Sequence, residues 1–310
     1  MIITQTPLRV SLLGGNTDFK EYFKRYGGAV LTTTIDKYIY CIVKERFDDE
    51  IWINYSIKER VTAVADIKHD IVRECLKFVG ITKGIEITFL SDIPSEGSGL
   101  GSSSAVAVGL LNALHAYKGE GVTQRQLAEE ACMIEIDILR KPIGYQDQYA
   151  IAYGGFNLIE FNEKISVTPI KPDGIDDSLM LFYTGVTRKA EKILEKMELN
   201  KEILDKIKLE TYKKLDHITD PVILGDLLDR YWAFKIKLNH YVSNPIIDRM
   251  YLDMLDAGAL GGKIVGAGGG GFLLVAVLPE HKKTLRDLNY KELPFRFSKY
   301  GSRVVFNING

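Results

Sequence analysis

The sequence predicts an α+β protein in two domains. Its 310 residues are enough for one large or two modest domains. Runs of β-branched and aromatic residues such as Thr32–Val43 indicate strands, and the apolar stripe of Thr123–Leu139 indicates a helix. The segment Lys171–Asp177, which contains a proline and a glycine, is the best candidate for a boundary. We therefore place the domains at residues 1–174 and 175–310.

The N-terminal part of the chain is expected to contribute most of the strands. A turn is expected at Gly14–Phe19, because its sequence GGNTDF is rich in residues that accept positive φ. A helix is expected at Asp66–Val79. Apolar and β-branched runs predict strands at Met1–Thr6 and Leu8–Leu13, which Pro7 separates, and at Thr32–Val43, Ile51–Tyr55 and Ile85–Leu90.

The stretch Pro94–Tyr117 combines a glycine-rich loop with an apolar helix. The loop Gly97–Gly101 exposes several backbone N–H groups, and Ser102, Ser103 and Ser104 open the helix because serine is a good N-cap. These donors and the positive end of the helix dipole would form a seat for a phosphate. The serine hydroxyls could also reach a magnesium ion carried by that phosphate. The alternative is a turn that only caps a core helix.

Two common phosphate-binding motifs are excluded. No G-x-x-x-x-G-K-[ST] occurs in the chain, so the loop is not a P-loop. A dinucleotide fingerprint needs its first glycine directly after a strand and an acid about 20 residues further on, at the end of the next strand. The strand Ile85–Leu90 ends well before Gly97, and Glu120 lies in a loop.

Glu135 falls on the apolar face of the helix Thr123–Leu139, for which Thr123 is the expected N-cap. A carboxylate on an inward face must be paired, protonated or bound to a metal. A buried salt bridge, or a position at the edge of the stripe with a wet tip, is the structural alternative. The apolar stripe, at about 100° per residue, consists of Leu127, Ala128, Ala131, Ile134 and Ile138.

Two further charged residues occupy unusual places. Arg9 lies in an apolar strand, where a guanidinium needs a partner or a ligand. Asp147 lies in a polar cluster that begins a short helix after Gly144. A buried structural ion pair is the alternative for Arg9, and a first-turn acid favoured by the helix dipole is the alternative for Asp147.

The rest of the chain is expected to be mainly helical, with strands around a glycine run. Five of the six residues in Gly266–Gly271 are glycine, and each costs entropy on ordering. Such a run is expected where two backbones, or a backbone and a ligand, nearly touch. Strands are expected at Phe156–Phe161, Ile165–Ile170, Leu179–Thr184, Lys263–Val265, Phe272–Leu278, Phe295–Ser298 and Val304–Asn307, and helices from Thr187 and at Lys201–His217, Pro221–Tyr241, Pro245–Asp256 and Glu280–Leu288.

Composition excludes several classes of function. The net charge is −1, so no basic surface argues for nucleic acid. No apolar stretch approaches the roughly 20 residues of a membrane span, and the N-terminus lacks a signal-peptide layout. Three scattered cysteines fit a reducing cytosol, so we expect a cytoplasmic protein. The five histidines form no H-x-x-x-H pair, which argues against a protein-held zinc site.

Three glycine-rich blocks, in this order, resemble the GHMP family of small-molecule kinases. PLRVSLLGGNTDF resembles the first family motif, PSEGSGLGSSSA the second, which is the nucleotide phosphate loop, and KIVGAGGGGFLL the third. The resemblance covers nearly the whole chain. It implies an N-terminal ATP-binding domain with the fold of ribosomal protein S5 domain 2, a ferredoxin-like C-terminal domain, and an active site in the cleft between them.

Within this family, the segments GYQDQYAIAYGGFN and FYTGVTRKAEKIL look most like heptose phosphate kinases. Those enzymes phosphorylate D-glycero-D-manno-heptose 7-phosphate at the anomeric oxygen, on a route to nucleotide-activated heptose. Asn16 departs from the family pattern, because many relatives carry glycine there. Fucose and galactose 1-kinases share the scaffold and are the first alternative.

The resemblance implies a role for each charged residue singled out above. Asp147 matches the catalytic aspartate in the pattern G-x-x-D-Q, and Arg9 matches the arginine beside it. Glu135, twelve residues before Asp147, matches the metal-binding glutamate, with Ser103 as the favoured serine ligand of magnesium. Asp18 matches a sugar-binding acid.

The same resemblance extends to the residues around the two substrates. ATP with Mg²⁺ and a sugar phosphate are the expected ligands, and a homodimer is left open. The placement of positive charges, independently of the resemblance, suggests that Arg188, Lys189 or Arg25 would hold the substrate's own phosphate. The expected nucleotide contacts are Gly97, Gly99, Leu100, Gly101, Ser102, Ser103 and Ser104, and the expected substrate contacts include Gly15, Asn16, Asp18, Arg188, Gly268 and Gly269.

Two alternatives come from other classes of function. A decarboxylase of the diphosphomevalonate type would share the fold, although the segments GYQDQ and TGVTR argue against it. A non-catalytic binding protein on this scaffold would be expected to have lost an acid or the serine loop. The sequence retains Glu135, Asp147 and the loop, so we expect an ATP-dependent sugar kinase.

Overall fold

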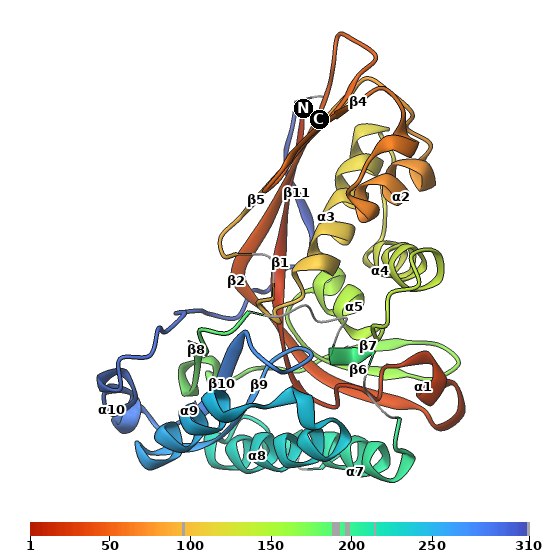
Figure 1. Cartoon of the computed structure of the whole chain (residues 1–310). Helices are drawn as coiled ribbons and strands as arrows, with labels where there is room; N and C mark the ends of the chain where they lie inside the picture. Colours follow the sequence, from red (N-terminus) through yellow and green to blue (C-terminus); the bar gives the residue numbers. More distant parts are fainter. Residues whose placement is uncertain (95–96, 188–192, 196–198, 214, 309–310) are drawn as a thin grey trace.

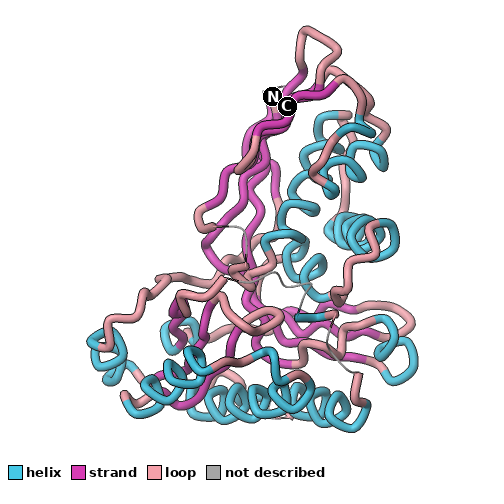
Figure 2. The backbone as a smooth tube through the Cα atoms, in the orientation of Figure 1, coloured by secondary structure: helices cyan, strands magenta, loops and turns pink. Residues whose placement is uncertain are grey.

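Two β-sheets organise the structure (Figures 1 and 2). The computed structural model describes residues 1–94, 97–187, 193–195, 199–213 and 215–308. Within these residues the chain forms an eight-stranded sheet and a three-stranded sheet. Figure 1 shows the large sheet extending from the two chain ends at the top of the view to a layer of helices at the bottom, with the small sheet near its lower end.

The large sheet mixes strands from both ends of the chain. Its main path has the order β11-β1-β2-β5-β3-β4, while β6 pairs with β2 and β7 pairs with β6. The pairs are antiparallel except for β3 and β5, which are parallel. The strands are β1 (Ile2–Leu13), β2 (Gly28–Glu45), β3 (Ile51–Asn54), β4 (Lys58–Val61), β5 (Ile85–Ser91), β6 (Phe156–Phe161), β7 (Ser166–Pro169) and β11 (Arg303–Asn307).

The two long strands are covered differently along their lengths. In β1 burial alternates over residues 2–5, whereas every residue from 6 to 13 is buried. In β2 residues 28–35 are all buried and burial then alternates. Alternation marks a sheet with one covered face, and continuous burial marks two covered faces. The lower half of the sheet is therefore enclosed on both sides, and Arg9 lies in this half.

Pro7 lies inside β1 rather than between two strands. Pro7 pairs with Tyr38 of β2, but the next residue, Leu8, pairs with Ile35, so the register shifts at the proline. Because proline has no N–H to donate, it is tolerated where the ladder is irregular. The expected gap is therefore absent: β1 is one continuous strand, and the extra residues at the register shift, Asp36 and Lys37, belong to β2.

Helices cover one face of the large sheet (Figure 1). The central helix α3 (Ser102–Tyr117) is buried nearly all round, as its apolar sequence predicts. Its Gly109 carbonyl accepts a 2.9 Å hydrogen bond from the Thr4 hydroxyl of β1. The other helices of this part are α1 (Lys20–Tyr26), α2 (Asp70–Val79), α4 (Gln124–Cys132), the π-helical η2 (Met133–Ile138) and α5 (Gln146–Tyr153).

Two helix starts can be compared with the sequence. Thr123 caps α4 as predicted, because its hydroxyl accepts from the Gln126 N–H at 3.1 Å. The helix expected at residues 66–79 instead begins at Asp70, after a separate 3-10 turn, η1 (Val64–Asp66). The side chain of His69 accepts from the Val72 N–H and caps α2, which explains the later start.

The small sheet is antiparallel, with the order β8-β10-β9, and has its own apolar core. Phe182, Trp232 and Met254 belong to this core, which joins the sheet to two of its helices. The expected strand at residues 295–298 makes only the isolated bridge from Phe297 to Ile35. The elements are β8 (Leu179–Tyr183), β9 (Ala259–Ile264), β10 (Phe272–Val277), α7 (Lys201–Tyr212), α8 (Pro221–Leu238), α9 (Pro245–Asp256) and α10 (Lys282–Asp287).

The expected helix bounds hold for α9, whereas three other helices are shorter than predicted. The helices α7 and α8 end before the 3-10 turns η4 (Leu215–His217) and η5 (His240–Val242). The helix expected at residues 280–288 divides into the 3-10 turn η6 (Pro279–His281) and α10. Most of the helix expected from Thr187 lies outside the described residues.

The end of the chain returns to the large sheet. Residues 303–307 form β11, which pairs with residues 2–5 of β1, so the two termini lie together in Figure 1. The domain boundary between residues 174 and 175 stays a prediction. The last strand, β11, belongs to the sheet formed by the first part of the chain. None of the helices in the described residues is long and apolar enough to span a membrane.

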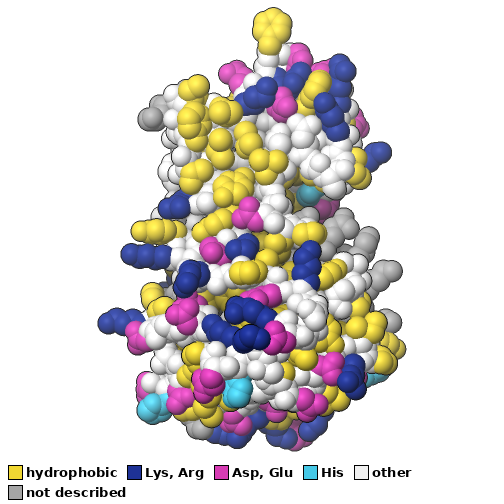
Figure 3. Space-filling view, turned by 90° about the vertical axis from the view of Figure 1, so that its left-hand side faces the viewer, with side chains coloured by type: hydrophobic (Ala, Val, Ile, Leu, Met, Phe, Trp, Pro, Cys, Tyr) yellow, Lys and Arg dark blue, Asp and Glu magenta, His cyan; other side chains and the backbone are white. Residues whose placement is uncertain are grey.

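The face of the molecule shown in Figure 3 carries apolar side chains in its upper part. The edge strand β11 and the interior strand β5 of the large sheet have exposed apolar residues, namely Leu90 of β5 and Val304, Val305 and Phe306 of β11. Scattered exposed apolar residues are normal in folded proteins. A homodimer stays a prediction.

Close packing of α3 on β1 gives a first testable prediction. A Cβ on Gly109 would lie 2.5 Å from the hydroxyl oxygen of Thr6, which is fully buried. Alanine is the better helix former by roughly 1 kcal/mol, yet we expect Gly109→Ala to lower the free energy of unfolding by about 1–3 kcal/mol, because the helix must move away from the strand. Urea unfolding measures this change.

The matched control for that variant is Gly121→Ala. A Cβ at Gly121 meets nothing within 4 Å. The control should change the free energy of unfolding by no more than about 0.5 kcal/mol. Equal stability of Gly109→Ala and the wild type would contradict the close contact between α3 and β1.

Candidate active site

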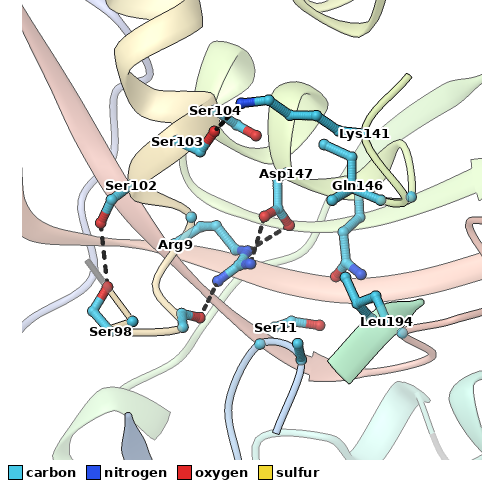
Figure 4. A pocket seen from close by; sticks show the side chains of 18 of the residues that line it. Arg9, Ser11, Ser98, Ser102, Ser103, Ser104, Lys141, Gln146, Asp147 and Leu194 are labelled. Atoms are coloured by element: carbon cyan, nitrogen blue, oxygen red, sulfur yellow. Dashed lines mark hydrogen bonds and ion pairs between the residues drawn. The ribbon is translucent and has the colours of Figure 1, made fainter. Parts of the chain in front are cut away.

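A cavity of about 710 Å³ opens between the large sheet and the second part of the chain. Figure 4 shows this cavity, with the side chains of β1, the glycine-serine loop and the start of α5 facing one another. Its wall also includes residues from the second part, among them Tyr231, Lys263 and Gly266. The size suits a small-molecule site, since ligand pockets commonly measure about 300–1,000 Å³.

Arg9 and Asp147 form a bidentate ion pair in this cavity. Arg9 Nε donates to Asp147 Oδ1 at 2.7 Å, and a terminal nitrogen donates to Oδ2 at 2.5 Å. Both residues line the cavity, and the Arg9 side chain is 6 % exposed while that of Asp147 is 23 % exposed, so the carboxylate is the more accessible of the two. Paired geometry of this kind orients both groups and gives strong charge-assisted hydrogen bonds.

Arg9 also holds the glycine-serine loop against the strand. Its second terminal nitrogen donates to the Gly99 carbonyl at 2.6 Å, and its backbone N–H donates to the Leu100 carbonyl at 2.9 Å. One side chain of β1 therefore fixes both the loop and the start of α5. Asp147 and the loop, which the family resemblance assigned to one active site, face the same cavity.

The start of α3 differs from the prediction that a serine caps it. Gly101 is the N-cap, with φ 79°. Because glycine has no side chain, the helix start has no side-chain capping hydrogen bond. A Cβ there would lie 3.0 Å from Arg9 Cγ, so glycine suits the position. Ser102, Ser103 and Ser104 instead occupy the first turn of the helix, where their hydroxyls are available to other partners.

The glycine run at residues 266–271 packs against this loop. A Cβ on Gly266 would lie 2.6 Å from the Gly99 carbonyl oxygen, and one on Gly271 would lie 2.5 Å from that of Ser98. The run is therefore needed where two backbones nearly touch, which is one of the two reasons that the sequence suggested. Glycines at these contacts allow the second part of the chain to approach the loop.

Glu135 is fully buried and satisfied by three side chains. Ser103 donates to Oε1 at 2.6 Å, while Ser104 and Gln148 donate to Oε2, each at 2.7 Å. Lys141 lies 4.0 Å from Oε1. The prediction that Glu135 lies on the inward face of its helix is confirmed, and the contacts with Ser103 and Ser104 link it to the cavity wall.

The oxygen atoms at Glu135 fit a magnesium ion better than a softer metal. Magnesium prefers oxygen ligands and usually takes one or two carboxylates together with substrate phosphates and waters. Ser103 and Glu135 supply a hydroxyl and a carboxylate at the start of α3. Within the described residues, no group of three or more His, Cys, Asp or Glu side chains could hold a metal by itself.

Asp18 is the second fully buried acid of the site. It accepts from the N–H groups of Asn16 at 2.9 Å and Gln146 at 3.1 Å. Burial is the main cause that raises the pKa of Asp18 to about 6, and the nearby charge of Asp147 adds to it. A Cβ on Gly144 would lie 1.9 Å from Asp18 Oδ2, so only glycine allows this approach.

Lys263 is a functional candidate that the sequence analysis missed. Its ammonium is buried and donates to the carbonyls of Ser11 at 2.8 Å and Leu12 at 3.1 Å. It also lies 4.2 Å from the centroid of the Tyr231 ring. Burial, reinforced by nearby cations, lowers the pKa of Lys263 well below its usual value. The signal was present, since a lysine in an apolar and glycine-rich strand is as unusual as Arg9.

Two polar atoms in the cavity wall have no hydrogen-bond partner within the described residues. They are Ser11 Oγ and Gln146 Oε1, and both are buried from solvent. Buried polar groups in native proteins are nearly always paired, so unpaired ones in a cavity indicate the place of a polar ligand. Gln146 lies on the Asp18 side of the site, because its backbone N–H donates to Asp18. Ser11 lies near it, since a Cβ on Gly15 would meet the side chains of both Gln146 and Ser11.

The other expected site residues are distributed unevenly. Gly15 and Asn16 line the cavity, but Leu100 has its side chain in the core and its N–H on Ser98 Oγ at 3.3 Å. The described cavity wall includes Gly266 and Ala267, whereas Gly268 and Gly269 pack against Val242. Arg25 lies in the last turn of α1, and Arg188 and Lys189 lie outside the described residues.

Comparison with known proteins assigns the chain to a family. The profile of the GHMP kinases N terminal domain matches residues 62–155, and that of the GHMP kinases C terminal domain matches residues 211–288. A D-glycero-alpha-D-manno-heptose 7-phosphate kinase from Campylobacter jejuni is 33% identical, over 97% of each chain. The chain belongs to the GHMP kinase family. The fold class and the family expected from the three glycine-rich blocks are thereby confirmed.

Solved structures and further relatives agree with the assignment of this GHMP kinase. The structure of a D-glycero-D-manno-heptose 1-phosphate kinase from Bacteroides thetaiotaomicron superposes with a TM-score of 0.81, at 27% identity and 99% coverage of both chains. A galactokinase from Pyrococcus furiosus is 26% identical and matches 96% of this chain and 95% of the relative. This GHMP kinase is an ATP-dependent phosphotransferase.

Asp18 gives a prediction for the pH dependence of stability. Its folded pKa of about 6 exceeds the usual 3.8, so the unfolded chain loses this proton first as the pH rises. The free energy of unfolding should therefore fall between about pH 4 and pH 6 and stay level for this group above that window. The total fall is about 3 kcal/mol, at about 1.4 kcal/mol per pKa unit.

Asp18→Asn should lack this fall, and urea unfolding of both proteins from pH 4 to pH 7 would measure the difference. Asp137→Asn is the control, because Asp137 lies in an exposed pair with Lys20 at 2.9 Å. Parallel stability curves for Asp18→Asn and the wild type would contradict the raised pKa of Asp18.

Proposed function

We propose that this GHMP kinase transfers the γ-phosphoryl group of ATP to the anomeric hydroxyl of D-glycero-D-manno-heptose 7-phosphate, giving the 1,7-bisphosphate for nucleotide-activated heptose. The observation that carries the proposal is the Arg9–Asp147 pair facing the glycine-serine loop across one cavity. Heptose occurs in the names of two relatives, although one name gives a 7-phosphate and the other a 1-phosphate.

The nucleotide would lie along the glycine-serine loop and the first turn of α3. The backbone N–H groups at this helix start and the helix dipole favour phosphate. Gly97, Gly99 and Gly101 all have positive φ, and they keep side chains away from that surface. The cavity extends from the loop to Tyr55 and His69, where the base of the nucleotide would fit between aromatic rings and α3.

Ser103 and Glu135 would hold the magnesium ion of the nucleotide. When bound there, the ion would supply charge neutralisation for the β- and γ-phosphates. The chain prepares the place in advance, because Ser103 and Glu135 are already joined by a 2.6 Å hydrogen bond. Gln148 and Ser104 hold the other carboxylate oxygen and fix the orientation of the group.

Asp147 would position the acceptor hydroxyl and take its proton. The anomeric oxygen forms the new bond to the γ-phosphorus, the bond from that phosphorus to the β-phosphate oxygen breaks, and ADP leaves. Arg9 uses three of the five N–H donors of a guanidinium in its contacts with Asp147 and Gly99. The remaining two would stabilise the negative charge on the phosphoryl group during its transfer.

The acceptor sugar would lie on the Asp18 side of the cavity. A heptose has several hydroxyls, and Ser11 Oγ and Gln146 Oε1 are the unpaired atoms that could bind them. Asp18 is held by two backbone N–H groups, which directs its carboxylate into the same corner. Arg188 stays the expected contact for the phosphate of the sugar.

Substitution of the proposed base tests the mechanism. We expect Asp147→Asn to lower kcat by about 10²–10⁴, because a positioned base contributes a factor of that size. Nucleotide binding should stay largely intact, since the loop and Glu135 are unchanged. Steady-state kinetics and calorimetric ADP titration measure the two effects, with Asp137→Asn on the surface as the control. Wild-type turnover in Asp147→Asn would show that the base is another group.

A panel of acceptors tests the substrate. We expect heptose 7-phosphate to exceed galactose, fucose and mannose in kcat/KM by at least about 10–100-fold, because a charge-assisted contact to its phosphate is absent in the others. ADP release gives the rate, ³¹P NMR gives the phosphorylated position, and Asp147→Asn gives the background.

The other outcomes of that panel are equally informative. A higher rate with fucose or galactose would replace heptose by another sugar. Release of carbon dioxide from a diphosphomevalonate substrate would favour the decarboxylase. Activity with none of these acceptors, together with tight binding of one, would favour a binding protein on the kinase scaffold.

A further inference from the structure

Lys141 is a cation at the phosphate end of the cavity that the mechanism above does not use. It lies in the loop between η2 and α5, and its side chain points at the first turn of α3 (Figure 4). Its Nζ is 3.4 Å from Ser103 Oγ, 4.0 Å from Glu135 Oε1 and 3.5 Å from Asp70 Oδ2. The ammonium is therefore placed among three oxygen acceptors at the edge of the cavity.

The backbone of Lys141 is tied to the helix turn that carries Glu135. Its N–H donates to the Glu135 carbonyl at 3.0 Å, and the preceding residue, Arg140, has a φ of 56°. Pro142 follows and restricts the backbone further. Since the side chain is only 12 % exposed, its ammonium has few other places to occupy.

The contacts of this ammonium are loose compared with others in the chain. Its nearest acceptor is 3.4 Å away, whereas the lysine–carboxylate pairs at Lys20 and Lys201 measure 2.9 and 2.5 Å. Within the described residues, Lys141 is also the ion-pair partner of the fully buried Glu135. A buried carboxylate needs such a countercharge. The ammonium supplies it without being held in a close contact.

An ammonium in this place can compensate for a missing metal ion. Ser103 and Glu135, the proposed metal ligands, are two of its three neighbours. A terminal phosphate seated on the first turn of α3 would lie beside Ser103, and thus within reach of Nζ. Asp70, the third neighbour, offers a second seat for the ammonium when a divalent cation neutralises Glu135.

We propose that Lys141 substitutes for the divalent cation, bridging Glu135 and a terminal phosphate of the nucleotide when no metal is bound and pairing with Asp70 when one is. The proposal rests on the proposed function for the place of the nucleotide, and it does not depend on which sugar is the acceptor. It implies that the loop accepts a nucleotide before the metal arrives, since the positive charge at the phosphate is already present.

The test compares ADP binding with and without metal. Calorimetric titration of the full chain in EDTA should show that Lys141→Met binds ADP about 10–100-fold more weakly than the wild type, because a charge-assisted contact is lost. With saturating Mg²⁺ the loss should shrink to less than about threefold, because the metal then carries the charge. This difference between the two conditions is the decisive quantity.

Two matched variants accompany Lys141→Met. Lys141→Arg keeps the charge and should bind ADP in EDTA within about threefold of the wild type. Lys20→Met removes an equal charge from the exposed pair with Asp137 on the neighbouring turn, and should change ADP binding in neither condition. Circular dichroism melting of each variant shows whether the fold is retained.

The outcomes separate this proposal from the proposed function. Wild-type ADP affinity of Lys141→Met in EDTA overturns it, and so does an equal loss in EDTA and in Mg²⁺, which a merely structural role would produce. If no heptose phosphate is phosphorylated, the substrate assignment fails while these binding equilibria still decide the role of Lys141. If ADP binds to no protein of the set in Mg²⁺, the nucleotide site itself is wrong and the proposal falls with it.

Discussion

The contact between the Arg9 guanidinium and its two partners is the constraint on which the site depends. A buried guanidinium must have its donors satisfied, and here Asp147 and the Gly99 carbonyl satisfy three of them. The partners come from two segments that begin about 90 and 138 residues later in the chain. Asp147 and the Gly99 carbonyl offset the cost of burying the guanidinium, and these contacts bring the start of α5 and the glycine-serine loop to one place.

Contact between two glycine-rich segments also fixes the position of the glycine-serine loop. The carbonyls of Ser98 and Gly99 lie so close to the run at residues 266–271 that a Cβ on Gly266 or Gly271 would collide with them. A residue larger than glycine at either position would push the two segments apart, so glycine is required for this backbone contact. The loop is thus held by Arg9 from one side and by the second part of the chain from the other.

Several buried charges lie at or beside the cavity, and each has a specific physical support. Glu135 is held by hydroxyl and amide donors, Asp18 by backbone N–H groups, and Lys263 by backbone carbonyls. Arg9, by contrast, is held by a close ion pair with Asp147. Because single buried charges are costly, their accumulation at one cavity is typical of a functional site rather than of a stabilising core.

The sequence by itself determined most of the elements and several of the charged residues at the cavity. The helical period predicted that Glu135 lies on the inward face of its helix, and the apolar strand around Arg9 indicated an unusual place for a charge. Three glycine-rich blocks indicated the family. All of these are local properties of the chain. Tertiary structure alone decided the partners: Gln148 and Ser104 on Glu135, Gly101 rather than a serine as the cap of α3, and Lys141 and Lys263 at the cavity. Gly268, Gly269 and Leu100 lie outside the described cavity wall, which their motifs did not indicate, since a motif does not show which way a residue faces. The physical reason is that pairing, burial and register arise between segments far apart in sequence, and no local pattern records them.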